Sequence, residues 1–495
     1  MRRHGIVFVR GSNPPHSTHF DKGKFGRLFP ILPPFAADNP SVRDALMEVG
    51  RKDGIMDAGD DLSDPVTLIT DPQKSANNPN NPDLSAGMTF LGQFLDHDMT
   101  FDPTSSLERQ QDPEAIENFR TPVLELDNVY GSGPGASPYL YDSSIDDGLT
   151  SFLVEEIPGS AAQSRDGAVR FDVPRNSQNV ALIGDPRNDE NLVISQLHLA
   201  MLKFHNAVVQ HVKSETGLTN PSEIFTEAQR LVRWHYQWII IHEFLHKTVG
   251  MNVVDDILKN GRRFYKWNNA PYIPVEFSVA AYRFGHSQVR PSYRANFGPS
   301  DAEQFFALAF DDTLPVSSDP ADLRGGKRAA RRFVDWQTFF DFDDGNVRPN
   351  KKIDTKLSSV LFDLSGLPSF EPQSLAQRNL LRNLAFGVPS GQAVAKAMEL
   401  EPLPPMDLAD LKPFHMDRRT PLWFYVLREA DVREDGKRLG PVGGRIVAEV
   451  FLGLLQGDHH SFLRQDPEWT PTLTNSNDFT MVDLLSFAGV VGTVT

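Results

Sequence analysis

The stretch ISQLHLAMLKFHNAVVQHV, residues 194 to 212, carries the strongest helical signal in the chain. Its apolar side chains, among them Ile194, Leu197 and Met201, recur three or four positions apart and so line one face of a helix. The same spacing recurs in residues 228–250, 374–387 and 442–456. The sequence therefore predicts a mainly α-helical protein.

Proline and glycine separate these helical stretches. The 495 residues include 37 Pro and 35 Gly, and their dense clusters mark loops between helices. Strand-like alternation is rare, and RTPVLELDNVYG (120–131) is the best extended candidate. Because no repeat or low-complexity linker divides the chain, we predict one large, loop-rich helical domain over residues 1–495. An extended N-terminal segment, residues 1–40, is expected to pack on it.

Composition narrows the classes of partner and chemistry. The formal net charge is −16 and no basic block stands out, so nucleic acid is not an expected partner. The absence of Cys excludes disulfides, thiolate ligands and a Cys nucleophile. No secretory signal is visible and the apolar runs fall short of the roughly 20 residues that span a bilayer. We expect a soluble monomer without a membrane span, and leave secretion or a cytoplasmic location open.

One short motif suggests zinc. HEFLH (242–246) has the H-E-x-x-H pattern with which zinc metallopeptidases begin their site, and His235 falls on the same helix face. A zinc peptidase also needs a third ligand at a suitable offset. The nearest downstream acids, Asp255 and Asp256, lie very close for that role. A zinc site is therefore a minor alternative.

Two stretches combine carboxylates with other polar groups. In GQFLDHD (92–98) the residues Asp96, His97 and Asp98 are consecutive, so they point in different directions. They fit either a polar turn or a base, His97, that faces a cavity. In RTPVLELD (120–127) alternate residues fall on one side of an extended chain and offer oxygen ligands that suit calcium. An amphipathic strand explains that spacing equally well.

Three further stretches contain candidate site residues. GDPRNDEN (184–191) opens the long helix on which His198 and His205 share a face, as hydrogen-bonded core histidines would. His286 follows Gly285 in an otherwise apolar segment. Asn379 and Arg382 are three residues apart, on one face of a predicted helix.

In this order, the five stretches resemble the animal-type haem peroxidases of the peroxidase–cyclooxygenase superfamily, especially their bacterial members. GQFLDHD resembles the family's distal-histidine motif, and RTPVLELDNVYGSGP its calcium loop. GDPRNDEN resembles the segment with the catalytic arginine. YRFGH (282–286) resembles the proximal-histidine motif, and NLLRNLAFGVP (379–389) the helix behind it. Residues 25–35 and 439–455 also look familial, so the resemblance covers nearly the whole chain.

The resemblance implies a haem b site. His286 would be the axial ligand of the iron, and Asn379 would accept a hydrogen bond from its other ring nitrogen. Arg283 and Arg382 resemble the family's partners of the haem propionates. Asp96 and Glu190 match the carboxylates that form ester links to haem in the mammalian enzymes.

On the opposite face of the haem, His97 matches the base that takes a proton from hydrogen peroxide and returns it to the leaving oxygen. Arg187 would stabilise the negative charge that develops there. Gln93 matches the residue that orients water or halide. The implied partners are hydrogen peroxide and a small reducing substrate, either a halide, thiocyanate or a phenol.

The resemblance also implies calcium beside the distal base. Its ligands would be Asp98, Thr121, Val123, Glu125 and Asp127. Glu125 departs from the shorter Asp that is usual in the family, which weakens the expectation for that ligand.

Two alternatives come from within the resemblance. Fatty-acid dioxygenases of the superfamily use a tyrosine three residues before the proximal histidine, where this chain has Arg283. Tyr282 is one position away, about 100° around a helix, and is not expected to face the same pocket. A catalytically silent, peroxidase-like binding protein is the other alternative, but such a scaffold does not need the full set of site residues. In this family HEFLH belongs to a structural core helix, and its second histidine stands where proline is usual.

Overall fold

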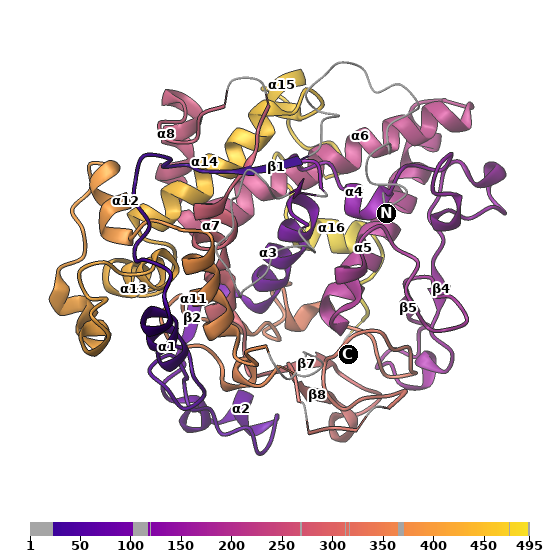
Figure 1. The fold of residues 1–495 in the computed structure, drawn as a ribbon. Helices are drawn as coiled ribbons and strands as arrows, with labels where there is room; N and C mark the ends of the chain where they lie inside the picture. Colours follow the sequence, from indigo (N-terminus) through magenta and orange to yellow (C-terminus); the bar gives the residue numbers. More distant parts are fainter. Residues whose placement is uncertain are drawn as a thin grey trace.

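The computed structural model describes residues 23–101, 117–118, 120–267, 270–311, 313–315, 317–364, 371–474 and 476–493. They form a mainly helical fold with a few short strands, which confirms the predicted fold class (Figure 1). The α-helices are α1 (Pro40–Val49), α2 (Thr67–Thr70), α3 (Ala86–Met99), α4 (Asp127–Tyr130), α5 (Leu192–Glu215), α6 (Pro221–Ile239), α7 (His246–Val249), α8 (Met251–Asn260), α9 (Val275–Ser278), α10 (Gly285–Gln288), α11 (Leu375–Ala385), α12 (Gly391–Ala397), α13 (Leu422–Glu434), α14 (Pro441–Gly457), α15 (Phe462–Gln465) and α16 (Met481–Phe487).

The four helices predicted from periodicity are all present, as α5, α6 with α7, α11 and α14. Figure 1 shows α3 near the middle of the molecule with α5 beside it, and these two helices are in contact. The buried apolar side chains form one cluster that extends from Phe25 to Ala488. The described helices therefore share one core, and the single domain over residues 1–495 stays a prediction.

α5 is a long and largely buried helix. Among the residues that the structure describes, it alone is long and apolar enough to cross a membrane by length and composition, yet 83% of that apolar window is buried within the protein. Its first turn is capped by Asn191, whose side chain accepts a hydrogen bond from the Ile194 N–H at 2.9 Å. α5 therefore packs as a core helix.

The prediction that residues 120–131 form an extended segment is wrong. Residues 120–126 form a loop in which Leu126 has a φ of 64°, and the helical turn α4 follows directly. In a strand, successive side chains alternate between the two faces, and a residue with left-handed backbone angles interrupts this alternation. The spacing of two residues between polar side chains therefore does not indicate a paired strand here.

The described residues contain four small sheets, of which two join distant parts of the chain and two pair neighbouring segments. Their strands are β1 (Gly23–Gly26) with β3 (Glu117–Asn118) and β6 (Ile273–Pro274), β2 (Asn80–Ser85) with β9 (Pro349–Lys351), β4 (Glu155–Glu156) with β5 (Phe171–Asp172), and β7 (Ser292–Asn296) with β8 (Phe305–Leu308). After β1, the backbone N–H groups of Leu28 and Phe29 donate to the buried Glu276 carboxylate at 2.8 and 3.1 Å. Residues 1–22 of the expected N-terminal segment lie outside the described residues.

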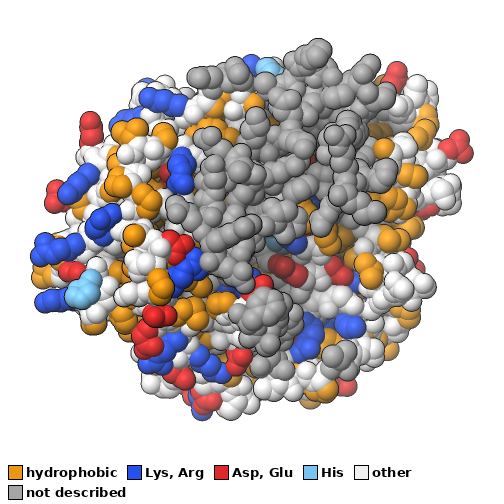
Figure 2. All heavy atoms as spheres, viewed as in Figure 1, with side chains coloured by type: hydrophobic (Ala, Val, Ile, Leu, Met, Phe, Trp, Pro, Cys, Tyr) orange, Lys and Arg blue, Asp and Glu red, His pale blue; other side chains and the backbone are white. Residues whose placement is uncertain are grey.

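On the face drawn in Figure 2, basic, acidic and hydrophobic side chains are interspersed among the described residues. Long-range binding of a polyanion needs a concentrated basic patch. The described part of this face does not present one.

Candidate active site

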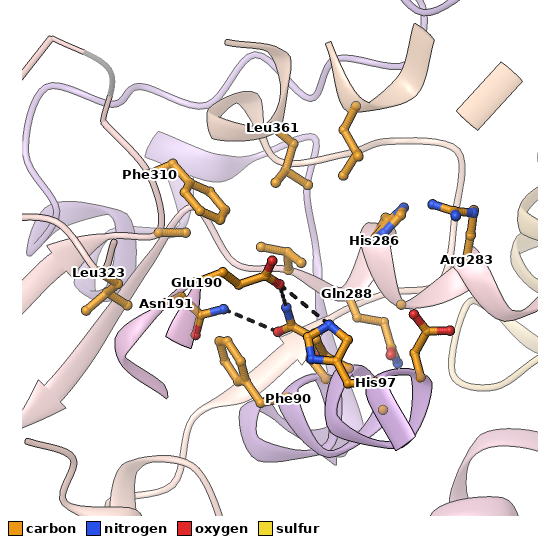
Figure 3. A pocket seen from close by; sticks show the side chains of 18 of the residues that line it. Phe90, His97, Glu190, Asn191, Arg283, His286, Gln288, Phe310, Leu323 and Leu361 are labelled. Atoms are coloured by element: carbon orange, nitrogen blue, oxygen red, sulfur yellow. Dashed lines mark hydrogen bonds and ion pairs between the residues drawn. The ribbon is translucent and has the colours of Figure 1, made fainter. Parts of the chain in front are cut away.

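A cavity of about 670 Å³ lies between α3, the start of α5 and the segment around α10 (Figure 3). Both predicted site histidines, His97 and His286, line it although they are far apart in sequence. The volume is in the range that cofactors and other small ligands occupy. The fold therefore brings the distal and proximal motifs to one site.

His286 sits on the single-turn helix α10. Its Nδ1 lies 2.7 Å from the side-chain nitrogen of Asn379 on α11, so the predicted pair is formed. The direction of the bond differs from the expectation, because the amide donates to the ring rather than accepting from it. The reason is Arg283, whose guanidinium carries only donors and occupies the amide oxygen at 3.2 Å. Burial, and after it the charge of Arg283, lowers the pKa of His286 to about 3.

His97 lies in the last turn of α3. Its Nδ1 is 2.7 Å from the side-chain oxygen of Asn188, and its Nε2 is 3.7 Å from a carboxylate oxygen of Glu190. Burial, followed by the positive charge of Arg187, lowers the pKa of His97 to about 4. The ring is therefore neutral near pH 7, as a base must be.

Glu190, Gln93 and Asn191 form the polar wall beside His97. The Gln93 amide donates to Glu190 and accepts from the Asn191 side chain at 3.3 Å, as the dashed lines in Figure 3 show. Desolvation within the site raises the pKa of Glu190 to about 7, while 46% of its side chain stays open to the cavity. This wall thus holds a proton donor or acceptor close to the histidine at neutral pH.

Arg187 is near His97 but turned away from the cavity. It lies in the 3₁₀ turn η7 (Pro186–Asp189) and pairs with the Asp185 carboxylate at 2.8 Å. Its guanidinium also donates to the backbone carbonyls of His97 at 3.1 Å and Thr100 at 2.5 Å. It is not among the described residues that line the cavity. In this structure Arg187 is therefore not placed to contact a bound oxidant directly.

Asp185 holds Arg187 together with Arg120. Burial alone would raise the pKa of Asp185, but the hydrogen bond and charge of Arg187 and the charge of Arg120 outweigh it and leave the pKa below its usual value. Arg120 also reaches Asp127, with a nitrogen–oxygen distance of 3.4 Å. This chain of charges connects the expected calcium loop to the distal arginine.

The expected calcium ligands lie partly together. Asp98 is fully buried, and one of its carboxylate oxygens accepts from the Leu126 N–H at 3.2 Å and the Tyr236 hydroxyl at 3.1 Å. The other oxygen has no hydrogen-bond partner among the described residues. Burial, and then the negative charge of Asp127, raises the pKa of Asp98. An orphaned oxygen beside a second carboxylate fits a cation, although the described residues contain no group of three or more His, Asp or Glu arranged to hold a metal.

The remaining predicted site residues divide into two groups. Asp96 and Arg283 line the cavity, whereas Arg382 does not. Arg378, one helical turn before Arg382 on α11, lines it instead, as does Arg324. Arg378 shares a helix face with Arg382, so the sequence contained a signal for it, but Arg324 is contributed by a loop that no motif marked.

Tyr282 corrects one expectation, because it lines the cavity. It belongs to the 3₁₀ turn η9 (Ala281–Phe284), whose step of about 120° per residue still separates it from Arg283. Both residues line the cavity because the cavity extends along the turn, where Phe284 lines it as well. Its hydroxyl donates to the backbone oxygen of Gly92 at 2.9 Å, and its ring stacks on Phe277 with centroids 4.7 Å apart. The side chain is tied into the wall.

HEFLH occupies a π-helical segment, η8 (Ile240–Leu245), and the turn that follows it. Its Glu243 accepts the backbone N–H of Met481 at 2.8 Å and pairs with Lys247 at 2.9 Å, so it caps α16. The His242 ring stacks on Trp238 with centroids 3.8 Å apart. These contacts give the motif a structural role.

The comparison with known proteins begins with a family model. The model described as animal haem peroxidase matches residues 106–313. The peroxidase-like protein of Margaritifera margaritifera is 25% identical over 313 residues, which are 57% of this chain and 38% of that protein. Mouse (Mus musculus) thyroid peroxidase is 26% identical over 187 residues, 37% of this chain and 20% of that protein. The matches thus span well under half the length of these relatives.

Solved structures show the same fold over most of the chain. Peroxidase A from Dictyostelium discoideum has a TM-score of 0.62 and 16% identity, covering 95% of this chain and 97% of that one. The fatty acid alpha-dioxygenase of Oryza sativa has a TM-score of 0.54 and 15% identity, covering 90% of this chain and 77% of that one. At such identities these likenesses concern the fold alone.

Proposed function

This chain is a member of the peroxidase–cyclooxygenase superfamily, and from that membership we propose that it is a haem peroxidase. It would reduce hydrogen peroxide and oxidise a small second substrate, either a halide, thiocyanate or a phenol. One observation carries the proposal: His97 and His286, from separate motifs, line a single cavity of about 670 Å³.

The lining of the cavity fits a haem. Aromatic rings such as Phe90, Phe284 and Tyr293 offer apolar walls to a flat macrocycle, and Arg283, Arg324 and Arg378 offer partners for its two carboxylates. His286 would hold the iron. When bound, the haem supplies the redox chemistry of peroxide reduction.

The proximal side has to rearrange when His286 becomes a ligand. A histidine that coordinates through Nε2 carries its proton on Nδ1, whereas the Asn379 amide now donates to that nitrogen. Arg283 therefore has to release the Asn379 oxygen so that the amide can turn and accept. A haem carboxylate is a suitable new partner for Arg283, which gives the expected role of this arginine a physical cause. Arg382, one helical turn after Arg378 on α11, stays in the proposal as a second propionate partner.

On the distal side His97 would act as the base. Its Nε2 takes a proton from peroxide and later returns it to the departing oxygen. Gln93 would orient water or halide at the same wall. Arg187 would stabilise negative charge there through its field, or through a side-chain rotation away from Asp185. Asp96 and Glu190 line the cavity, as carboxylates that form ester links to haem must.

Calcium completes the proposal. Asp98, Thr121, Val123, Glu125 and Asp127 would hold it, with the orphaned oxygen of Asp98 as the supporting observation. A cation there would tie the end of α3, and with it His97, to the loop before α4.

The experiment is reconstitution of the chain with haem. We expect a Soret band and peroxide-dependent oxidation of phenols or halides. A chain that binds haem but does not turn over peroxide is a silent scaffold, and a chain that binds zinc and no haem contradicts the proposal.

A dioxygenase is the second candidate, because Tyr282 lines the cavity and fatty acid alpha-dioxygenases share the fold. The Tyr282 hydroxyl donates to a backbone carbonyl, which cannot take up the proton that a tyrosine loses on oxidation. We therefore expect no oxygen uptake with long-chain fatty acids, and equal peroxidase rates for wild type and Tyr282→Phe. Uptake that is lost in Tyr282→Phe would favour the dioxygenase.

A further inference from the structure

Asn188 lies between two histidines. Its side-chain oxygen is 2.7 Å from Nδ1 of His97, and its side-chain nitrogen is 3.0 Å from Nδ1 of His198. We propose that Asn188 and His198 are positioning residues that hold His97 in the tautomer with its proton on Nδ1. The inference rests on the proposed peroxidase function, in which His97 is the distal base.

The chemistry of the three groups sets the direction of the contacts. An amide oxygen can only accept, so the His97 Nδ1 that faces it carries hydrogen. An amide nitrogen can only donate, so the Nδ1 of His198 accepts. The free lone pair of His97 is therefore on Nε2, the atom that lies 3.7 Å from Glu190 on the cavity wall.

Burial protects this arrangement from competing water. His97 is 5% exposed, and Asn188 and His198 are 0% exposed. The backbone N–H of Asn188 bonds the Asp185 carbonyl at 3.0 Å inside the turn η7, and His198 stands on α5, which packs against α3. Three separate elements thus aim their side chains at one another.

The proximal pair shows that the fold controls the direction of such an amide. Asn379 meets Nδ1 of His286 with its nitrogen, because the donor Arg283 occupies its oxygen. Asn188 meets Nδ1 of His97 with its oxygen, and its nitrogen is taken by an accepting histidine. The third side chain is a donor, Arg283, at the proximal pair and an acceptor, His198, at the distal pair. His286 and His97 are therefore left in opposite tautomers.

His198 differs in this respect from His205, its neighbour two turns along α5. Both ring nitrogens of His205 are bonded, to the Tyr130 hydroxyl at 3.0 Å and the Thr150 carbonyl at 2.9 Å. The Nε2 of His198 has no hydrogen-bond partner among the described residues. His205 is satisfied by the fold around it, whereas the one polar contact recorded for His198 is the amide of Asn188.

The hydrogen-bond chain from His198 through Asn188 to His97 matters for proton transfer. When peroxide is cleaved, its proton moves to Nε2 of His97 and the electron pair stays on oxygen. The resulting imidazolium keeps its Nδ1–H on the Asn188 oxygen, which stabilises the positive charge. As the O–O bond breaks, the proton on Nε2 would pass to the departing oxygen, which leaves as water, and the two electrons for this reduction would come from the haem.

The test compares Asn188→Leu, Asn188→Asp and His198→Leu with His205→Leu as the matched control on the same helix. Asn188→Leu should slow the first reaction with peroxide by about 10- to 100-fold, and slow cyanide binding similarly, because hydrogen cyanide also has to lose a proton to bind. Oxidation of the second substrate should keep its rate. Asn188→Asp should restore both rates to within about threefold, since a carboxylate is also an acceptor. His198→Leu should fall between these variants, and His205→Leu should lose stability without losing rate.

A second readout does not need haem. Nitrogen-15 spectra of the full-length chain with labelled histidine distinguish the two tautomers, and the His97 signal is identified by its loss in His97→Gln. We expect the Nδ1–H pattern in wild type and in Asn188→Asp. An Nε2–H pattern in wild type, or an unchanged peroxide rate in Asn188→Leu, overturns the proposed hydrogen-bond chain from His198 through Asn188 to His97. If the wild type shows no peroxide reaction, the proposed function fails, while the spectra still decide the tautomer.

Discussion

At the scale of single residues, an arginine or histidine neighbour decides which ring nitrogen of each cavity histidine carries the proton. The same Asn–His pairing occurs twice, at Asn379–His286 and Asn188–His97, with the amide reversed. The family resemblance predicted that Asn379 and His286 would meet, whereas the contact of Asn188 with His97 was not predicted. Which end of the amide faces the ring was not predictable, because it depends on a third side chain from another part of the chain.

The first prediction concerns His286. His286→Ala should abolish the Soret band of the reconstituted protein, because the cavity loses the ring expected to hold the iron. Absorption spectra at equal haem and protein concentrations check this. His246→Ala, in the HEFLH motif, is the control and should bind haem like wild type. Loss of bound metal in His246→Ala and not in His286→Ala would revive the zinc alternative.

At the scale of elements, buried carboxylates from other helices bind the N-termini of α14 and α16, in addition to the Thr480 cap that α16 already has. Glu243 accepts from the first residue of α16, and Glu429 on α13 accepts from Val442 and Gly443 at the start of α14 at 2.8 and 3.3 Å. Carboxylates favour helix N-termini because the unpaired N–H groups there carry partial positive charge. Each cap fixes one helix against another that is distant in sequence.

The second prediction concerns pH and Glu429. Burial raises its pKa from 4.5 to about 7, so between these values the folded chain binds a proton that the unfolded chain has lost. The free energy of unfolding should therefore fall as pH rises from about 4.5 to 7, and this contribution should be flat above that. Glu429→Gln should remove on the order of 2 kcal/mol of this decline. Denaturant unfolding of both proteins across this range measures the difference.

Glu434→Gln on the same helix provides the control, because its carboxylate pairs with Arg438 at 2.8 Å near the surface. Its pH profile should match that of wild type. A wild-type slope that survives in Glu429→Gln would assign the pH dependence to other carboxylates.

The third prediction concerns calcium between α3 and α4. A chelator should lower the melting temperature, and added calcium should restore it, by about 3 °C at a hundredfold excess over Kd. Asp98→Asn should remove this response, since it replaces the orphaned carboxylate oxygen with an amide. Thermal unfolding with and without chelator measures it. A response that persists in Asp98→Asn would place the ion elsewhere.

At the scale of the whole molecule, the cavity adjoins one apolar core to which α3, α5 and α11 all contribute, and α10 lines the cavity. Ligand binding in a shared core stabilises all of these elements together. The candidate site and the stability of the fold are therefore coupled.

The fourth prediction follows from this coupling. Calorimetry of the haem-free chain should give one unfolding transition, as a single domain requires. Saturating haem should raise its midpoint on the order of 4 °C, from the binding energy and the entropy expected for a chain of 495 residues. Two transitions, of which haem moves one, would contradict the single domain.

Much of this protein was readable from local patterns. Apolar spacing predicted α5, α6, α11 and α14, because a helix face is defined by residues a few positions apart. The motifs also identified His97, Gln93, Glu190, Arg283 and His286 as site residues, and all of them line the cavity.

Other features depended on contacts between distant segments. The sheets β3–β1–β6 and β2–β9, the position of Arg324 and the inward face of Tyr282 carried no readable local signal, because each is set by a partner far away in the sequence. The same holds for the proton on His97, which Asn188 and His198 direct. Local spacing determines which side chains share a face of a helix, whereas packing between helices determines which atoms of those side chains meet.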